Sequence, residues 1–208
     1  MRAQDGRTGH DPRSPQPVVR RRGAELCGAI YLATLEELAD NGFEQLSFDR
    51  IAARAGAGKA SLYRRWRSPA ELVLDALTDP LAGFGEPVVP DTGSLRLDLI
   101  AVLTNLADVL NEPRGRALRP LLTQRPRHPQ LFDEVFRRVA QPLFALLLHV
   151  LQRAADRHGA DPRAVTERIA AVGAQLVIMA HMQSAPLPLS EIEAIVDEVV
   201  IPLAGSLR

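Results

Sequence analysis

The chain has 208 residues, of which 46% are hydrophobic and 24% charged, a balance that argues against global disorder. Its 25 basic and 25 acidic residues cancel, so binding to nucleic acid would have to rest on a local cluster of positive charge. The single cysteine, Cys27, excludes an intrachain disulfide and a thiolate metal cluster, and the absence of a signal-like or membrane-spanning apolar run predicts a cytoplasmic protein.

The N-terminal segment, residues 1–19, contains many Gly, Pro and Arg residues, and we expect it to be a disordered tail. Three arginines follow, and the last of them, Arg22, directly precedes an expected helix over residues 23–41. Basic arms of this kind contact phosphates or the minor groove in DNA-binding proteins, whereas the alternative is a solvated tail.

Residues 43–77 carry the most informative pattern of the chain, two short helices joined by a tight turn. Ser47 is a good N-cap for the first helix, and the glycines of residues 55–58 permit the sharp turn that follows it. In the second helix Leu62 and Trp66 are four residues apart and share a face, so this face can pack while the other stays exposed. The exposed face offers hydrogen-bond donors and cations, which suits a helix lying in a DNA major groove.

This stretch resembles the DNA-binding region of the TetR/AcrR family of bacterial transcriptional regulators, over about residues 20–77. The matching positions are Gly42, Phe43, Ser47, Ile51, Ala52, Ala55, Gly56, Leu62, Tyr63 and Trp66. Two positions depart from the family pattern: Gly58 replaces the usual serine cap of the second helix, and Pro69 replaces a common phosphate-contacting lysine. The resemblance implies an all-α fold, with a three-helix helix-turn-helix DNA-binding domain over residues 20–67 and a helical ligand-binding and dimerisation domain over residues 68–208.

The expected DNA contacts lie where positive charge is concentrated. From Glu44 to Ser68 there are six cations and two acids, whereas from Ala76 to the end there are thirteen cations and fifteen acids. The candidate DNA-binding residues are Arg22, Ser47, Arg50, Lys59, Ala60, Ser61, Tyr63, Arg64 and Arg65. We expect Leu62 and Trp66 to anchor their helix to Leu38, Phe43 and Ile51.

The second part of the chain is expected to be helical throughout, because no alternating strand pattern occurs in it. Its first helix follows Ser68 and ends near Thr78, before a linker rich in Pro and Gly. Five further helices are expected over residues 91–111, 113–124, 129–158, 161–183 and 190–207, with Pro142 kinking the third of them.

Two nearly all-apolar stretches, residues 142–151 and 176–183, are expected to lie centrally and to line a ligand cavity. For their histidines the alternative is a satisfied place in the core. The candidate ligand-binding residues are Leu106, Leu110, Phe136, His149, Gln175, Met179, His181 and Met182. The apolar lining favours a hydrophobic or aromatic effector.

The last two helices each carry an apolar face, and the family resemblance implies that they pair with their copies in a four-helix dimer interface. The candidate interface residues are Ile169, Val172, Gly173, Leu176, Ile195 and Val199. Packing inside one subunit would explain Gly173 equally well. A twofold dimer also fits DNA reading, because it places two recognition helices about one DNA turn, roughly 34–36 Å, apart.

We therefore expect a ligand-responsive transcriptional regulator, a repressor that binds a palindromic operator as a homodimer. Its partners would be double-stranded DNA and a small hydrophobic effector, with no cofactor, no metal and no membrane. The effector would release the operator by moving the helix that begins after Ser68.

Other functions remain open at this stage. An activator of the same fold would share every residue named above, and a helical small-molecule-binding or interaction protein could have lost DNA binding. An enzyme is not expected, since the sequence lacks a phosphate-binding loop, a nucleophile elbow and metal-ligand spacing among its five histidines. Adjacent acid pairs such as Glu36–Glu37 and Asp133–Glu134 are expected on the solvated surface.

Overall fold

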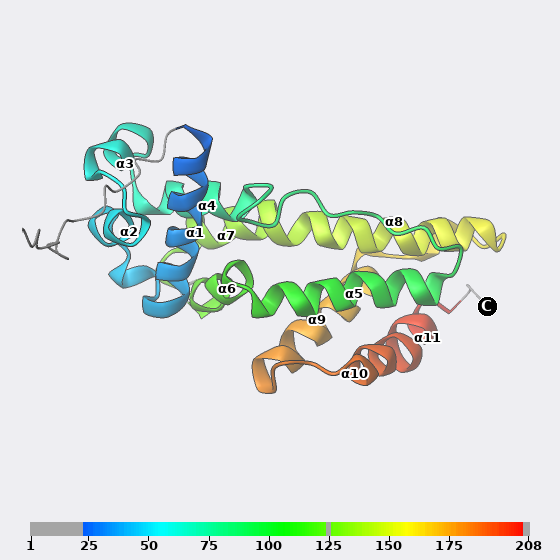
Figure 1. Ribbon diagram of the computed structural model, residues 1–208. Helices are drawn as coiled ribbons and strands as arrows, with labels where there is room; N and C mark the ends of the chain where they lie inside the picture. Colours follow the sequence, from blue (N-terminus) through cyan, green and yellow to red (C-terminus); the bar gives the residue numbers. More distant parts are fainter. Residues whose placement is uncertain (1–22, 124–125, 206–208) are drawn as a thin grey trace, which may run out of the picture.

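The computed structural model describes residues 23–123 and 126–205, which fold into helices without any strand and confirm the all-α class. Four helices, α1 (Ala24–Asn41), α2 (Phe48–Ala55), α3 (Lys59–Arg65) and α4 (Pro69–Thr78), gather at one end of the molecule in Figure 1. The rest is built from α5 (Leu95–Asn111), α6 (Pro113–Thr123), α7 (Pro129–Val135), α8 (Gln141–Arg157), α9 (Glu167–Gln183), α10 (Leu189–Ala194) and α11 (Ile201–Leu203). The predicted tail over residues 1–19 and the candidate Arg22 lie outside the described residues.

Several helix ends in the first part lie at serines and glycines, residues that commonly cap helices. The hydroxyl of Ser47 accepts the backbone N–H of Arg50 at the start of α2, and Ser68 caps α4 in the same way. Gly56 closes α2 in the left-handed conformation at φ 62°, which other residues adopt only with strain. Gly58 precedes α3 without a side chain to cap it.

Two helices of the second part begin later than predicted. The helix expected from residue 91 begins at Leu95, because Gly93 before it takes a left-handed conformation at φ 85° and Ser94 then caps the helix. The helix expected from residue 161 begins at Glu167, after a separate 3₁₀ turn over Pro162–Ala164. The last helix, in contrast, begins one residue earlier than predicted, at Leu189, so Ser190 is not its cap. It ends at Leu203.

Two helices contain a wide (π) turn just before a proline. The turn over Phe136–Ala140 precedes Pro142, and the turn over Ile195–Val200 precedes Pro202. A proline has no N–H and its ring collides with the carbonyl four residues earlier, so a wider turn lets the helix continue. The kink predicted at Pro142 is therefore a local widening within a continuous helical run over residues 129–157.

The buried apolar side chains form two clusters that do not follow the order of the sequence. The first cluster contains residues of α1–α4 together with Ala117 and Leu121 of α6 and Leu131 and Val135 of α7. The second contains the buried faces of α5, α8, α9 and the α10–α11 segment. The domain boundary at residue 68 stays a prediction, but the apolar side chains of α4 pack into the first cluster.

The segment between α4 and α5, residues 79–94, runs along α8 and is called the strap below (Figure 1). It passes close to α4 at Gly83, where a Cβ would lie 2.3 Å from the carbonyl oxygen of Ala76. Arg114 of α6 donates to the Gly83 carbonyl oxygen at 2.6 Å, and Arg157 of α8 donates to Asp91 at 2.7 Å. The expected linker is therefore an ordered part of the molecule, held at both ends by arginines.

Candidate functional site

Helix α3 is anchored through one face. Leu62 is fully buried and Trp66 is 4% exposed, and both lie in the same cluster as Leu38 and Ile51. The indole N–H of Trp66 donates to Asp75 Oδ2 at 2.8 Å. The spacing of Leu62 and Trp66 in the sequence thus identified the buried side of the helix.

The opposite face of α3 is open to solvent. Tyr63 is 62% exposed, and Arg64 and Arg65 beside it are also exposed. Ala60 is exposed and Ser61 is half-buried at the start of the helix. The structure therefore brings these five candidate DNA-binding residues onto one short helix, with two cations and a phenol projecting from it.

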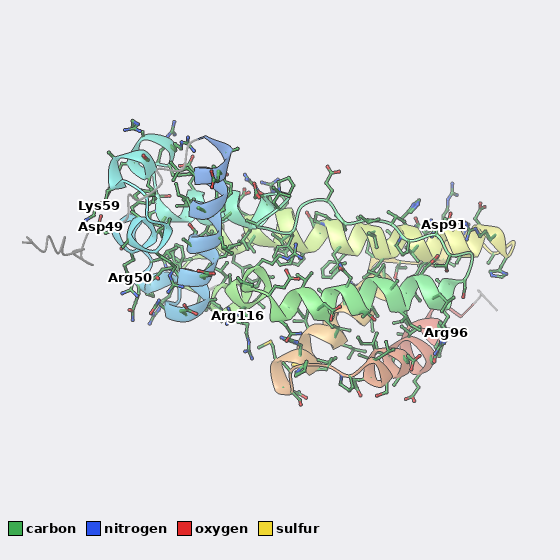
Figure 2. The ribbon with its side chains drawn as sticks, in the orientation of Figure 1. Asp49, Arg50, Lys59, Asp91, Arg96 and Arg116 are labelled. Carbon is green, nitrogen blue, oxygen red and sulfur yellow. The ribbon has the colours of Figure 1, made fainter. Side chains whose placement is uncertain are left out.

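Two other candidate DNA contacts, Lys59 and Arg50, carry acidic partners (Figure 2). The ammonium of Lys59 lies 2.8 Å from Asp49 Oδ2, and both side chains are more than half exposed, so this pair is weak and open to exchange with a phosphate. The Nε–H of Arg50 donates to Glu37, whose side chain is only 4% exposed. Ser47 is occupied as the cap of α2, so its hydroxyl is shared with the backbone.

Glu37 contradicts the expectation that the Glu36–Glu37 pair lies on the solvated surface, because Glu37 is buried. Its carboxylate also lies 3.0 Å from Arg54 Nε and accepts the side-chain N–H of Asn41 at 3.0 Å. A buried carboxylate is stable only with such partners. The sequence held a usable signal for this burial: Glu37 lies three residues after Thr34 and seven after Ile30, so it shares their buried face of α1.

Two adjoining cavities lie in the second part of the molecule. The large cavity, about 400 Å³, is open to solvent on one side and is lined by residues of the strap, α5, α6, α8, α9 and the π turn over Phe136–Ala140. The small cavity, about 90 Å³, lies between α6, α9 and the helical run formed by α7 and its π turn. The partition between them consists of the residues that line both, namely Leu110, Leu118, Val139, Ala140 and Ile178.

The structure brings five of the eight predicted ligand residues to these cavities. Leu106 and Leu110 line the large cavity, and Leu110 also lines the small one. The small cavity is lined in addition by Phe136, His181 and Met182.

The other three predicted ligand residues, His149, Gln175 and Met179, are exposed and line neither cavity. Helices α8 and α9 each turn one face to solvent, and these three side chains lie on that face. Hydropathy along a nearly all-apolar run does not reveal which side faces inward, because the run has almost no polar stripe to set the phase.

The strap and α6 contribute lining residues that the sequence analysis missed. Phe84, Pro87 and Val88 of the strap line the large cavity, together with Arg114 of α6. The guanidinium of Arg114 lies 5.9 Å from the centre of the Phe84 ring. A segment rich in Pro and Gly has no periodicity, so its sequence gave no sign that it forms a wall.

His181 is a buried polar side chain of the small cavity. It is 5% exposed, and its Nδ1 atom has no hydrogen-bond partner. Burial lowers the pKa of His181, the positive charge of Arg119 lowers it further, and the Leu110 carbonyl acts in the opposite direction. The imidazole is therefore neutral at neutral pH, with one ring nitrogen unsatisfied.

Replacing His181 with leucine is expected to reduce the acid sensitivity of folding. In the unfolded chain a histidine titrates near 6.5, whereas the folded pKa of His181 lies lower, so between these values the unfolded state binds more protons. The stability that depends on neutral His181 is complete above 6.5 and is lost as the pH falls through that window. Urea midpoints measured from about pH 7.5 to about pH 5 should therefore fall further for the wild type than for His181→Leu. If the urea midpoints of the two proteins fell equally with pH, burial would not lower the pKa of His181.

The predicted dimer residues fall into two groups. Gly173 and Ile195 are buried within the subunit, and a Cβ at Gly173 would lie 2.9 Å from Val200 Cγ2 and 3.2 Å from Leu103 Cδ1. The alternative for Gly173, close packing inside one subunit, is therefore what the structure shows.

The remaining dimer candidates lie nearer the surface. Leu176 is 37% exposed on α9, and Ile169, Val172 and Val199 are half-buried. Met179 of α9 is a further exposed apolar side chain near these residues, at 55%.

Within the described part of the chain, no three His, Cys, Asp or Glu side chains are grouped so that they could hold a metal ion. None of the helices described there combines the length and the hydrophobicity needed to cross a membrane.

Comparison with known proteins decides the family. Residues 30–76 match the family model for bacterial regulatory proteins of the tetR family. Residues 89–199 match the model for the tetracyclin repressor-like C-terminal domain. The chain belongs to the TetR family of transcriptional regulators. The first range lies within α1–α4, and the second covers most of the part that contains the cavities, without the strap residues 84–88.

Relatives of this TetR-family regulator are similar over most of their length. An uncharacterised HTH-type transcriptional regulator of Mycobacterium tuberculosis is 31% identical over 177 residues, covering 83% of this chain and 85% of the relative. A DNA-binding transcriptional repressor TetR of Mycobacteroides abscessus is 31% identical over 187 residues, covering 88% and 95%. The solved structure of the TetR family transcription regulator SCO0332 has a TM-score of 0.59 and 26% identity, covering 85% of this chain and 97% of that chain.

Proposed function

We propose that this TetR-family regulator is a repressor that binds an inverted-repeat operator as a homodimer and leaves it when a small apolar effector occupies the cavities. The observation that carries the proposal is the two-sided character of α3. Leu62 and Trp66 fix one side to the core, while Tyr63, Arg64 and Arg65 project from the other. A protein that acts on DNA in this way works in the bacterial cytoplasm and needs no enzymatic activity.

The DNA contacts are assigned by the position of each side chain. We propose that Lys59, Ser61, Tyr63 and Arg64 contact base edges in the major groove. Arg65, Arg50 and the Ser47 end of α2 are proposed to contact phosphates, where cations and helix N-termini bind. Arg50 would have to share its guanidinium between Glu37 and a phosphate, so its contribution is smaller than that of Arg64.

The dimer is proposed to form through the exposed apolar face of α9 and the α10–α11 segment. Val172, Leu176 and Met179 lie at helical spacing on one side of α9, and the last two are 37% and 55% exposed. Leu203 of α11 is 50% exposed and adds apolar area. Apolar surface of this kind marks an interface when it is contiguous, and a twofold axis would pair it with itself.

Helix α6 is the proposed mechanical link between effector and DNA. Its Ala117 and Leu121 pack into the same cluster as α1, while its Leu118 belongs to the partition between the cavities. Helix α4 provides a second route, because it contacts α7. A ligand that binds better to a displaced position of α6 or α4 would shift the population of the DNA-binding form by that difference in affinity.

The proposal is tested by selecting bound sequences from a random duplex pool and measuring the enriched site at two salt concentrations. We expect an inverted repeat with half-sites roughly 34–36 Å apart. Each phosphate contact should add about 0.9 to the slope of log affinity against log salt concentration. Sedimentation of the free protein should show a dimer. A folded protein that enriches no sequence would contradict DNA binding, and an unrelated half-site pattern in a monomer would contradict the dimer.

Replacing Arg64 with alanine is expected to weaken operator binding by about 1–3 kcal/mol and to relax the base preference at one position of each half-site. The reason is that Arg64 is exposed on the projecting face of α3 and supports no buried contact, so the change removes recognition without removing stability. Arg163→Ala is the matched control, since Arg163 is an exposed arginine outside the DNA-binding end. Equal operator affinity of the two variants would contradict the assignment.

A further inference from the structure

The wall of the small cavity contains a buried polar atom, Nδ1 of His181, that forms no hydrogen bond. The rest of the lining is apolar apart from Arg119, which is exposed. A buried polar atom left unpaired destabilises the folded state. Such an atom in the wall of a cavity is a point where a bound molecule would gain a hydrogen bond.

An aromatic row leads from this cavity to the large one. Phe132 and Phe136 line the small cavity with nearly parallel rings, at 16° and 6.5 Å between centroids. Phe144 lines the large cavity, and its ring centroid lies 6.0 Å from that of Phe136. These separations fall in the range of favourable aromatic pairs, so a further ring placed beside the row would extend it.

The volumes show how a ligand would have to lie. The small cavity, about 90 Å³, is smaller than the roughly 150 Å³ cavity known to hold a benzene ring, whereas the large cavity holds about 400 Å³. A ring would therefore occupy the large cavity and send a small polar group past the partition residues towards His181. Ala140 has the smallest side chain of the partition, a single methyl group, and lies four residues from both Phe136 and Phe144.

We propose that the effector is a neutral phenolic compound with an apolar substituent, whose hydroxyl group hydrogen-bonds to His181 Nδ1 in the small cavity. A hydroxyl suits either tautomer of a neutral imidazole, because it both donates and accepts. The ring lies beside Phe136 and Phe144, and the substituent fills the large cavity. This inference rests on the proposed function, in which the two cavities form the effector site.

The charges around the cavities favour a neutral ligand. In the large cavity Arg114 donates to the Gly83 carbonyl, and its guanidinium lies over the Phe84 ring. Its Nε lies 2.8 Å from the Glu112 carboxylate, so its positive charge is paired, but this buried Nε makes no hydrogen bond. Of the acidic residues, Glu86 lines the large cavity, but it is exposed. Neither cavity presents an uncompensated buried charge that would select an anion or a cation.

Calorimetric titration of the free, full-length protein at neutral pH tests the inference with four matched probes. They are para-propylphenol, para-propylanisole, propylbenzene and para-propylbenzoate, which differ only in the polar group on the ring. A phenol hydroxyl titrates near 10, so the first probe is neutral under these conditions. The wild type is expected to bind the phenol roughly 10-fold more tightly than the ether or the hydrocarbon, since only the phenol can satisfy Nδ1 whichever tautomer is present.

Variants assign the effect to His181. His181→Leu is expected to lose the preference for the phenol while still binding propylbenzene, and His181→Gln, which keeps hydrogen-bonding groups, should retain part of it. His149→Leu is the matched control, because His149 is exposed outside both cavities. Thermal melts establish that each variant is folded.

Three results would overturn the inference: equal affinity for phenol and hydrocarbon, tightest binding of the benzoate, or no binding of the phenol to the wild type. The titration contains no DNA, so these results leave operator binding untouched. Conversely, a protein that enriches no operator would contradict the proposed function and still give a clear titration.

Discussion

Replacing Trp66 with alanine is expected to destabilise the N-terminal helices by about 3–5 kcal/mol, the usual cost of removing a large buried aromatic side chain. Trp66 is 4% exposed, packs edge-on against Tyr31 with 5.9 Å between ring centroids, and donates its indole N–H to Asp75. The alanine variant would leave a cavity beside α1 and a carboxylate without its donor. Since Trp66 directly follows α3, operator binding should be lost together with stability.

The measurement is urea unfolding followed by circular dichroism, because the variant lacks the only tryptophan of the chain and cannot be followed by its fluorescence. Tyr63→Ala is the matched control, an aromatic truncation on the exposed side of the same helix. It should cost only about 1 kcal/mol, through the edge contact between Tyr63 and Phe48. Trp66→Phe should fall between the two. A Trp66→Ala variant as stable as Tyr63→Ala would show that the indole does not anchor α3.

The features that could be predicted from sequence are those set by local chemistry. Ser47, Gly56 and Ser68 each determine a helix end through their own hydroxyl group or backbone freedom, and the structure has all three ends as predicted. The pair Leu62 and Trp66 identified the buried side of α3, since two large apolar residues four apart can point only to one face.

The features that could not be predicted depend on partners far away in the chain. Asp91 was expected to begin α5, but it lies in the strap before that helix, where it pairs with Arg157, 66 residues later. His149 and His181 both interrupt apolar helical runs, yet only His181 is buried, because the neighbours of α8 and α9 decide which face is covered. The strap is the clearest case, since its course along α8 depends on arginines that no pattern within the strap reveals.

Replacing Asp98 with alanine is expected to destabilise the second part of the chain by about 3 kcal/mol, a large cost for a polar side chain. Asp98 is 2% exposed, and its carboxylate accepts both the backbone N–H and the hydroxyl of Thr92, at 2.8 and 2.7 Å. It also accepts from Arg153 at 3.0 Å, and Arg153 in turn donates to the carbonyl of Pro90. Removing the carboxylate takes the buried acidic partner from Arg153, which keeps only the Pro90 carbonyl and the exposed Asp91, and leaves the backbone N–H of Thr92 without its acceptor.

The consequence for function follows from the position of the strap. Because the strap forms one wall of the large cavity, loosening its end at Thr92 should enlarge the ensemble of cavity shapes and weaken binding of an apolar ligand. Denaturant unfolding and calorimetric titration of the same variant would show both effects. Asp98→Asn keeps an acceptor for Thr92 but loses the charge that holds Arg153, so it should lie between alanine and the wild type.

The matched control for Asp98 is Asp91→Ala, which removes a 54%-exposed carboxylate of the strap that pairs with Arg157 and lies 3.7 Å from Arg153, the arginine that Asp98 also contacts. Exposed ion pairs contribute about 0–1 kcal/mol, so this change should be small although it breaks the shorter of the two aspartate–arginine contacts. Comparing the two variants shows whether the burial of the carboxylate or its short distance to an arginine determines how much it stabilises the fold. If Asp91→Ala and Asp98→Ala lowered the free energy of unfolding equally, the strap would be held by charge at its surface, and the buried network around Asp98 would have no special part in closing the cavity.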